Sequence, residues 1–179
     1  MAILTSPNYD GKHHDDNSIS NCINYILRPD KAIHGYYGYS GFGARLYSVP
    51  FHRIGQSLTE AMKELEATNK RKDTIKIRHF IVSFAPWELN DPQIADQIAR
   101  RCIAYFASEY QTVYGVHEDT GNLHFHIAVN PVSFVDGCRY RGQHAEFNYM
   151  RVFFTDVLNE FGIHTLHYQA QKKTSLWQQ

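Results

Sequence analysis

The sequence has no excess of either charge, few cysteines and no long apolar run. Its 18 basic and 18 acidic side chains balance, which argues against diffuse electrostatic binding of nucleic acid and leaves room for a local basic groove. Cys22, Cys102 and Cys138 are odd in number and far apart. They fit neither a disulfide framework nor zinc-knuckle spacing, so we expect a reducing cytoplasm.

Targeting signals and repeats are also missing. The N-terminal stretch MAILTSPNYDGKHHDD lacks the apolar core of a signal peptide, and no segment is apolar enough to cross a membrane. The chain has 179 residues, of which 43% are hydrophobic and 14% aromatic, so it can bury a real core. We therefore expect residues 1–179 to form a single domain, with 165–179 as a flexible C-terminal tail.

The stretch YGVHEDTGNLHFHIAVN dominates what is present. Apolar residues alternate with His124 and His126, which predicts a strand whose two imidazoles share a face. Turn-forming residues precede it, so a hairpin would place His117 across from His124 and Gly115 across from His126. Because the chain has eleven histidines, an H-x-H pair can easily arise by chance. A third histidine on the same small, polar face favours a three-nitrogen metal site.

Hydrophobic periodicity outlines the remaining elements. We expect strands at Ile3–Ser6, Lys76–Phe84 and Ile163–Gln169, and a further hairpin at Val132–Tyr140. We expect helices from Asn17 or Ser18 to Leu27, from a capping box at Ser57 and Glu60 to Thr68, from Asp91 to Ser108, and from Ala145 to Glu160. The pattern predicts an α+β fold, with an antiparallel sheet of about five strands, helices on one face and the histidines on the other.

A glycine-rich segment from Ile33 to Val49 holds several aromatic residues. Exposed rings among glycines can stack on unpaired bases, which makes Tyr36, Tyr37 and Tyr39 candidates for DNA contact. Ordinary strand or core packing explains the same rings equally well, so both interpretations stay open.

Three motifs, in order along the chain, resemble those of HUH relaxases, the mobilisation nucleases of conjugative plasmids and integrative elements. They are N-Y-I-L-R-P-D-K-A, R-H-F-I-V-S-F-A-P-W-E and the histidine stretch above, and the similarity is greatest to the MobP/MobL-like branch. Together they cover most of Ile19 to Asn130. The resemblance implies an HUH-endonuclease-like fold and a site- and strand-specific nuclease that nicks and rejoins DNA at a transfer origin.

The resemblance also assigns roles to residues. It places the nucleophile on Tyr25, the metal on His117, His124 and His126, and supporting roles on Ser83 and Glu88, with a 5′-phosphotyrosine intermediate. It implies single-stranded DNA with an adjacent hairpin as substrate, accessory relaxosome proteins as partners, a bacterial cytoplasm, and manganese or magnesium as the divalent metal. Imidazole ligands by themselves suit zinc, nickel or cobalt.

Other polar residues near these motifs are candidates for lesser roles. Asp119, Asn122 and Asn130 could orient the imidazoles, although the first two could equally build only the turn. Arg28 and Lys31 follow Tyr25 closely and could hold the DNA backbone, as could Arg139 and Arg141.

Three alternatives remain open. A rolling-circle replication initiator or single-strand transposase of the HUH class would place its tyrosine after the histidine strand, where Tyr149 is the plausible candidate. An unrelated metal hydrolase would use metal-bound water and need no tyrosine. A non-enzymatic metal-containing DNA-binding module would cut nothing.

Overall fold

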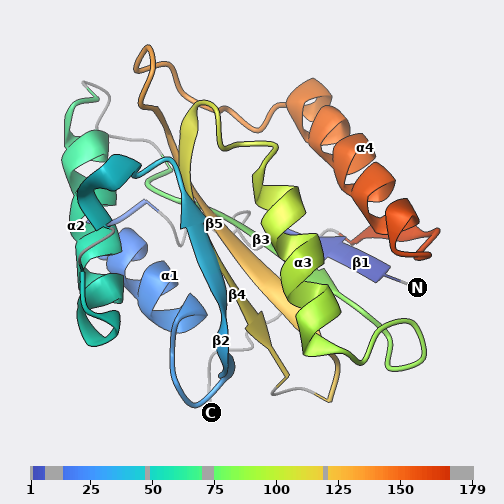
Figure 1. Ribbon diagram of the computed structural model, residues 1–179. Coiled ribbons are helices and arrows are strands. Elements are labelled where there is room, and N and C mark those ends of the chain that lie inside the picture. The colour runs from blue at the N-terminus through green and yellow to red at the C-terminus, as the bar shows by residue number, and fades with distance from the viewer. Residues whose placement is uncertain (1, 7–13, 47–48, 70–74, 119–120, 170–179) are drawn as a thin grey trace.

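The computed structural model describes residues 2–6, 14–46, 49–69, 75–118 and 121–169. Within these ranges the strands form one six-stranded sheet in the order β2-β4-β5-β3-β1-β6 (Figure 1). The strands are β1 (Ala2–Thr5), β2 (Ala32–Ser40), β3 (Arg78–Ser83), β4 (Tyr110–His117), β5 (His124–Ser133) and β6 (Leu166–Gln169). The α-helices are α1 (Ser18–Ile26), α2 (Ile54–Ala67), α3 (Pro92–Ile103) and α4 (His144–Glu160). Short 3₁₀ helices span Gly43–Leu46 and Phe51–Arg53.

The sheet is antiparallel except at one edge, which confirms the expected α+β class. β4, β5, β3 and β1 pair antiparallel in turn, β2 pairs antiparallel with β4, and only the β1–β6 pair is parallel. The sixth strand is β6. Its residues 166–169 belong to the segment 165–179 that the sequence led us to expect as a tail. Residues 170–179 lie outside the described ranges.

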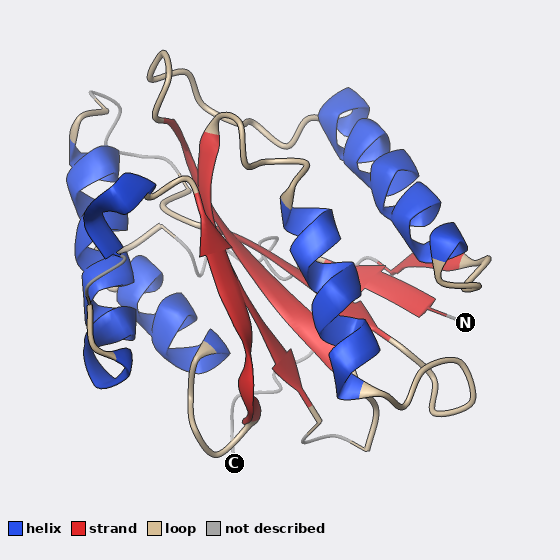
Figure 2. Cartoon of the chain, viewed as in Figure 1, coloured by secondary structure: helices blue, strands red, loops and turns tan. Residues whose placement is uncertain are grey.

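The helices divide between the two faces of the sheet, which corrects the expectation that they share one (Figure 2). Odd-numbered Val113 of β4 and even-numbered Ala128 of β5 pack with α1 and α2. Their strand neighbours Tyr114 and Ile127 point to the other face and pack with α3 and α4. Sequence periodicity shows which side of a helix is buried but not which face of the sheet it covers.

Helix α1 lies on the face that carries the histidines. Its buried residues Ile19, Cys22, Ile23 and Ile26 recur at helical spacing, as expected from the sequence. Asn17 stands at the N-cap position but makes no capping hydrogen bond through its side chain. The end of α1 therefore meets β4 and β5 where their histidines point.

Some helix ends agree with the prediction from the sequence and others do not. Asp91 caps α3 by accepting a hydrogen bond from Gln93 N at 2.8 Å, and Pro92 opens the helix, as expected. The capping box expected at Ser57 is wrong, because α2 begins three residues earlier at Ile54. A capping box does occur at α4, between Gln143 and Glu146.

Two global properties agree with the sequence. Cys22, Cys102 and Cys138 are free thiols. No helix in the described ranges is long and apolar enough to cross a membrane.

Candidate active site

The β4–β5 hairpin brings three histidines together on one face. His117 ends β4 and pairs with His124 of β5, while Gly115 pairs with His126, both as predicted. The ring centroids of the three histidines are 4.5–5.5 Å apart, and one nitrogen from each lies within 4.8 Å of the others. All three side chains are buried, so the cluster is a concentrated set of nitrogen ligands.

Main-chain carbonyls fix the tautomers of two of these histidines. His117 Nε2 lies 2.9 Å from Ile26 O, and His124 Nδ1 lies 2.8 Å from Asn122 O. A carbonyl oxygen only accepts, so the contacting nitrogen of each neutral ring carries the hydrogen. His117 Nδ1 and His124 Nε2 then hold the lone pairs that a metal ion needs.

The third histidine, His126, offers a nitrogen lone pair at a buried position. His126 Nε2 is buried and has no hydrogen-bond partner in the described chain. Burial lowers the pKa of His126 well below its usual value of 6.5, and neighbouring His79, His117 and His124 lower it further. A neutral ring with an unsatisfied buried nitrogen fits a metal ligand, so the donor set suits a divalent cation.

Tyr25 lies against this cluster from the last turn of α1. Its half-buried ring is centred 5.1 Å from the ring of His126 and 5.7 Å from that of His117. By contrast Tyr149, the alternative candidate, is 70% exposed on α4, which packs on the opposite face of the sheet. Of these two tyrosines, Tyr25 is the one that contacts the histidine rings.

A glycine permits this approach of α1 to the sheet. A Cβ atom at Gly115 would lie 2.6 Å from Ile26 O and 3.0 Å from Ile26 Cγ2. The end of α1 therefore occupies the space beside Gly115, and Ile26 O is also the acceptor for His117. One backbone contact thus positions both the helix of Tyr25 and a histidine.

Two cations flank the Tyr25 ring. The guanidinium carbon of Arg28 lies 5.8 Å from the ring centroid and Lys31 Nζ lies 5.7 Å from it. Arg28 Nε also donates to Asp30 Oδ1 at 2.9 Å, which holds the guanidinium near the helix end. The balanced charge of the whole chain thus coexists with two cations beside the phenol, one of which, Arg28, is ion-paired with Asp30.

The supporting residues expected from the second motif lie at different distances from the cluster. Ser83 ends β3 and pairs with His124, so it lies beside that histidine on the same face. Glu88 lies in the loop between β3 and α3, where its carboxylate accepts from Ala85 N at 3.1 Å.

The residues expected to orient the imidazoles also differ in what they contact. Asn122 serves His124 through its main-chain oxygen. Asn130 donates to Met62 O and Gln111 Oε1 and accepts from Val132 N, contacts that hold α2 against the sheet. Asp119 lies outside the described residues.

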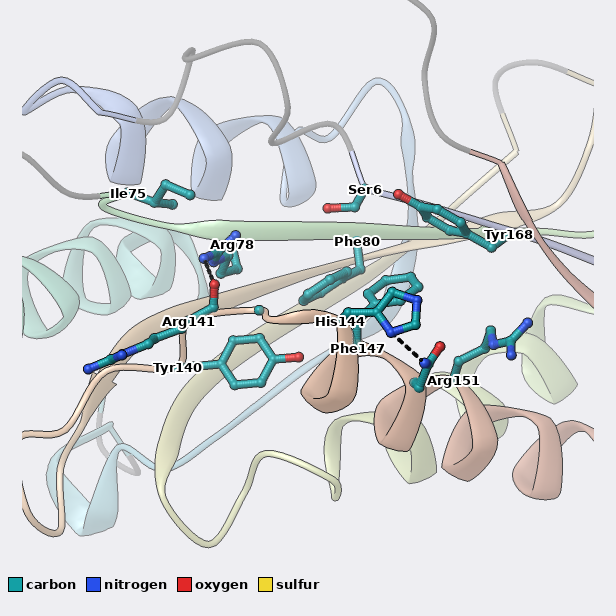
Figure 3. Close-up of a pocket in the computed structure, with 12 residues that line it drawn as sticks. Ser6, Ile75, Arg78, Phe80, Tyr140, Arg141, His144, Phe147, Arg151 and Tyr168 are labelled. Carbon is teal, nitrogen blue, oxygen red and sulfur yellow. Dashed lines mark hydrogen bonds between the residues drawn. The ribbon is translucent and has the colours of Figure 1, made fainter.

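The two arginines of the second hairpin lie at the opposite end of β5. Arg139 bridges to Val132, is mostly buried, and lies 3.7 Å from Glu66 in an ion pair. Arg141 is exposed beside a pocket of about 740 Å³ between α4 and the sheet, where its carbonyl accepts from Arg78 (Figure 3). None of the three histidines lines that pocket.

The aromatic residues of β2 are half-buried. Tyr36 packs against the core under α3 and α4, while Tyr37 and Tyr39 pack against the core under α1 and α2. Tyr37 also lines a pocket of about 630 Å³ together with Arg28 and with Asn24, the residue before Tyr25. The tyrosine rings of β2 are therefore partly packed into the core and partly exposed.

His79 is a site residue that the sequence did not reveal. It lies on β3, 8% exposed, with Nε2 2.9 Å from His126 Nδ1 and its ring 6.5 Å from that of Tyr25. Alternation in β3 already puts His79 and Ser83 on one face. The missing information was that β3 pairs with β5 across 47 residues of sequence.

Comparison with known proteins shows which family the chain resembles. Residues 45–163 match the family described as "Relaxase: MobA/VirD2-like, nuclease domain". This range contains the three histidines, Ser83, Glu88 and His79, but begins after Tyr25.

Three curated proteins are also similar. Two proteins from Escherichia coli, each called Protein TraI, are 39% identical over 80 residues and 35% identical over 94 residues. Protein MobA of Acidithiobacillus ferrooxidans is 34% identical over 64 residues. These matches cover 42%, 45% and 35% of this chain, but only 11%, 13% and 15% of the relatives.

Proposed function

The chain belongs to the MobA/VirD2-like relaxase nuclease family, and from that premise we propose that it nicks and rejoins one DNA strand at a transfer origin, with Tyr25 as nucleophile. The observation that carries this proposal is the packing of the Tyr25 ring against His126 and His117. The target would be the origin of a plasmid or integrative element, with a hairpin next to the cut. Accessory relaxosome proteins and a bacterial cytoplasm belong to the same proposal.

In the proposed reaction the Tyr25 oxygen attacks the scissile phosphorus. A Tyr25 O–P bond forms as the P–O3′ bond breaks, so the 5′ end becomes a phosphotyrosine and the 3′ oxygen leaves as a hydroxyl after taking up a proton. A free phenol has a pKa of about 10 and needs assistance near neutral pH. The positive charges of Arg28 and Lys31 lie beside the phenol and would attract the DNA phosphates.

His117, His124 and His126 would hold the divalent cation, which polarises the scissile phosphate and offsets its charge during the attack. The chain's own contribution is to hold these rings in place and away from water, and burial lowers the pKa of His126. The family resemblance favours manganese or magnesium, whereas three imidazoles suit zinc, nickel or cobalt.

The DNA strand would reach Tyr25 along β2 and the end of α1. Arg28 and Tyr37 line one pocket beside the nucleophile's helix, which suits a phosphate and a stacked base. Tyr39 would extend the aromatic surface, whereas Tyr36 points to the opposite face of the sheet and would not meet this strand. Exposed Arg141 would meet DNA only at the far end of β5, so we assign it to the flanking DNA hairpin, whereas mostly buried Arg139 is held by Glu66.

The remaining polar residues have smaller proposed roles. Ser83 would contact the DNA or the ring of His124, beside which it lies. Glu88 would fix the loop that follows Ser83, since its carboxylate already binds the main chain there. Asn122 would orient His124, and we retain Asp119 as a candidate for orienting another ring, whereas Asn130 would hold α2 against the sheet.

A nicking assay tests the proposal. Single-stranded oligonucleotides from the DNA beside the gene, chosen for an inverted repeat, are incubated with protein and metal and run on a denaturing gel. We expect a nick plus a covalent protein–DNA band for the unaltered chain and for His167→Ala, an exposed control on β6. We expect neither product for His124→Ala or His126→Ala.

The gel also separates the alternatives. A free nick without an adduct would indicate a metal hydrolase that uses water. Tight binding without a nick on any oligonucleotide would indicate a DNA-binding module, and either outcome would overturn the proposal.

A further inference from the structure

Each of the three clustered histidines has a hydrogen-bond partner at its second nitrogen, but only two of these partners are carbonyl oxygens. For His117 and His124 the acceptors are Ile26 O and Asn122 O. At the same place beside His126 stands the imidazole of His79, with Nε2 2.9 Å from His126 Nδ1. The two rings are centred 5.0 Å apart and inclined by 31°, a tilted arrangement rather than a perpendicular packing contact.

We propose that His79 is a positioning residue that fixes the tautomer and orientation of His126 for metal binding. His79 Nε2 accepts the hydrogen of His126 Nδ1–H, which leaves the lone pair of His126 on Nε2. That Nε2 atom is the one buried without a hydrogen-bond partner in the described chain. The inference rests on the three-histidine metal centre of the proposed function.

The surroundings explain why the acceptor is a side chain here. His126 lies inside β5, between β4 and β3, so the adjacent main-chain carbonyls belong to the sheet. His79 lies on β3 with its side chain on the same face, and its own carbonyl accepts from Ser6 Oγ at 3.4 Å. β3 therefore holds the His79 ring at a fixed position beside His126.

An imidazole acceptor also differs in charge from a carboxylate. A carboxylate beside His126 would add a negative charge to the site and oppose the incoming phosphate. A neutral His79 orients the ring equally well and leaves the positive charge of the cation undiminished. The arrangement suits a site that must bind an anionic DNA backbone.

The tautomer can be read directly in the metal-free protein. Two-bond ¹H–¹⁵N correlation spectra of the imidazole rings should show His126 in the Nδ1–H form in the unaltered chain. His79→Ala should lose this preference, whereas the exposed-site control His167→Ala should keep it. A predominant Nε2–H form of His126 in the unaltered protein would overturn the proposal.

Metal affinity gives the second measurement. Calorimetric titration with Co²⁺ should show about 10–100-fold weaker binding for His79→Ala, the usual loss for such a partner. His79→Gln, whose side-chain oxygen also accepts, should recover most of that affinity, with the visible Co²⁺ spectrum unchanged. Recovery in this variant separates positioning from a general loss of folding.

Three results would contradict the role of His79. Equal affinity in the unaltered chain, His79→Ala and His167→Ala would show that His126 needs no partner. Equally weak binding by His79→Ala and His79→Gln, with an altered Co²⁺ spectrum, would make His79 a ligand itself. Absence of Co²⁺ binding by the unaltered chain would overturn the metal centre as well, which distinguishes the two failures.

Discussion

At the scale of single residues, Gly115 shows how closely the candidate site depends on backbone space. Its pairing with His126 follows from the sequence, since alternation in β5 and the intervening turn fix the register of the hairpin. The sequence did not reveal that Ile26 O would fill the space beside it. That contact depends on where α1 packs, which no local pattern specifies.

Gly115→Ala should therefore damage both the fold and the site. The added methyl group would lie 2.6 Å from Ile26 O, so α1 must shift, at a cost of about 1–3 kcal/mol in the free energy of unfolding. Urea denaturation measures that cost, and Co²⁺ titration should show weaker binding because Ile26 O also holds His117.

Gly55→Ala is the matched control. Gly55 lies within α2, and its Cβ would make an ordinary 3.6 Å contact with Leu27 Cδ1. Alanine in a helix should leave stability unchanged or raise it by up to about 1 kcal/mol. An unaltered metal affinity in Gly115→Ala would show that the end of α1 does not position His117.

At the scale of elements, local signals predicted the strands and most helices, while long-range pairing stayed hidden. The histidine hairpin, α3 with its cap and the buried stripe of α1 all follow from periodicity within one segment. His79 became visible only when β3 was placed beside β5. The sequence also did not reveal which face of the sheet each helix covers, because this depends on the order of the strands.

The cap of α3 gives a test at this scale. Asp91→Ala removes the acceptor for Gln93 N and should lower the free energy of unfolding by about 0.5–2 kcal/mol, measured by urea denaturation. Asp156→Ala, an exposed position within α4, should change it by less than about 0.5 kcal/mol. Equal effects of the two substitutions would mean that Asp91 does not cap α3 in solution.

At the scale of the whole molecule, α1 and α2 cover the histidine face while α3 and α4 cover the other. The buried histidines, Tyr25 and the flanking cations meet where α1 ends against the hairpin. A neutral net charge therefore does not exclude a local basic site, because Arg28 and Lys31 lie together beside Tyr25.

Metal binding should stabilise this whole assembly. A ligand at one hundred times its dissociation constant adds about 2.7 kcal/mol, which for a chain of this size raises Tm by roughly 5–11 °C. Thermal unfolding with Co²⁺ and with a chelator measures the difference. His126→Ala should abolish the shift, and an undiminished shift in that variant would place the cation elsewhere.

The central claim is that Tyr25 forms the covalent bond with DNA. The most direct measurement is peptide mass spectrometry of the trapped protein–DNA complex, with Tyr25→Phe as the matched variant that lacks only the phenolic oxygen. We expect the modification on the peptide that contains Tyr25, and an unmodified Tyr25→Phe protein that still binds DNA and metal. DNA attached to Tyr149 or to any other tyrosine would contradict the account.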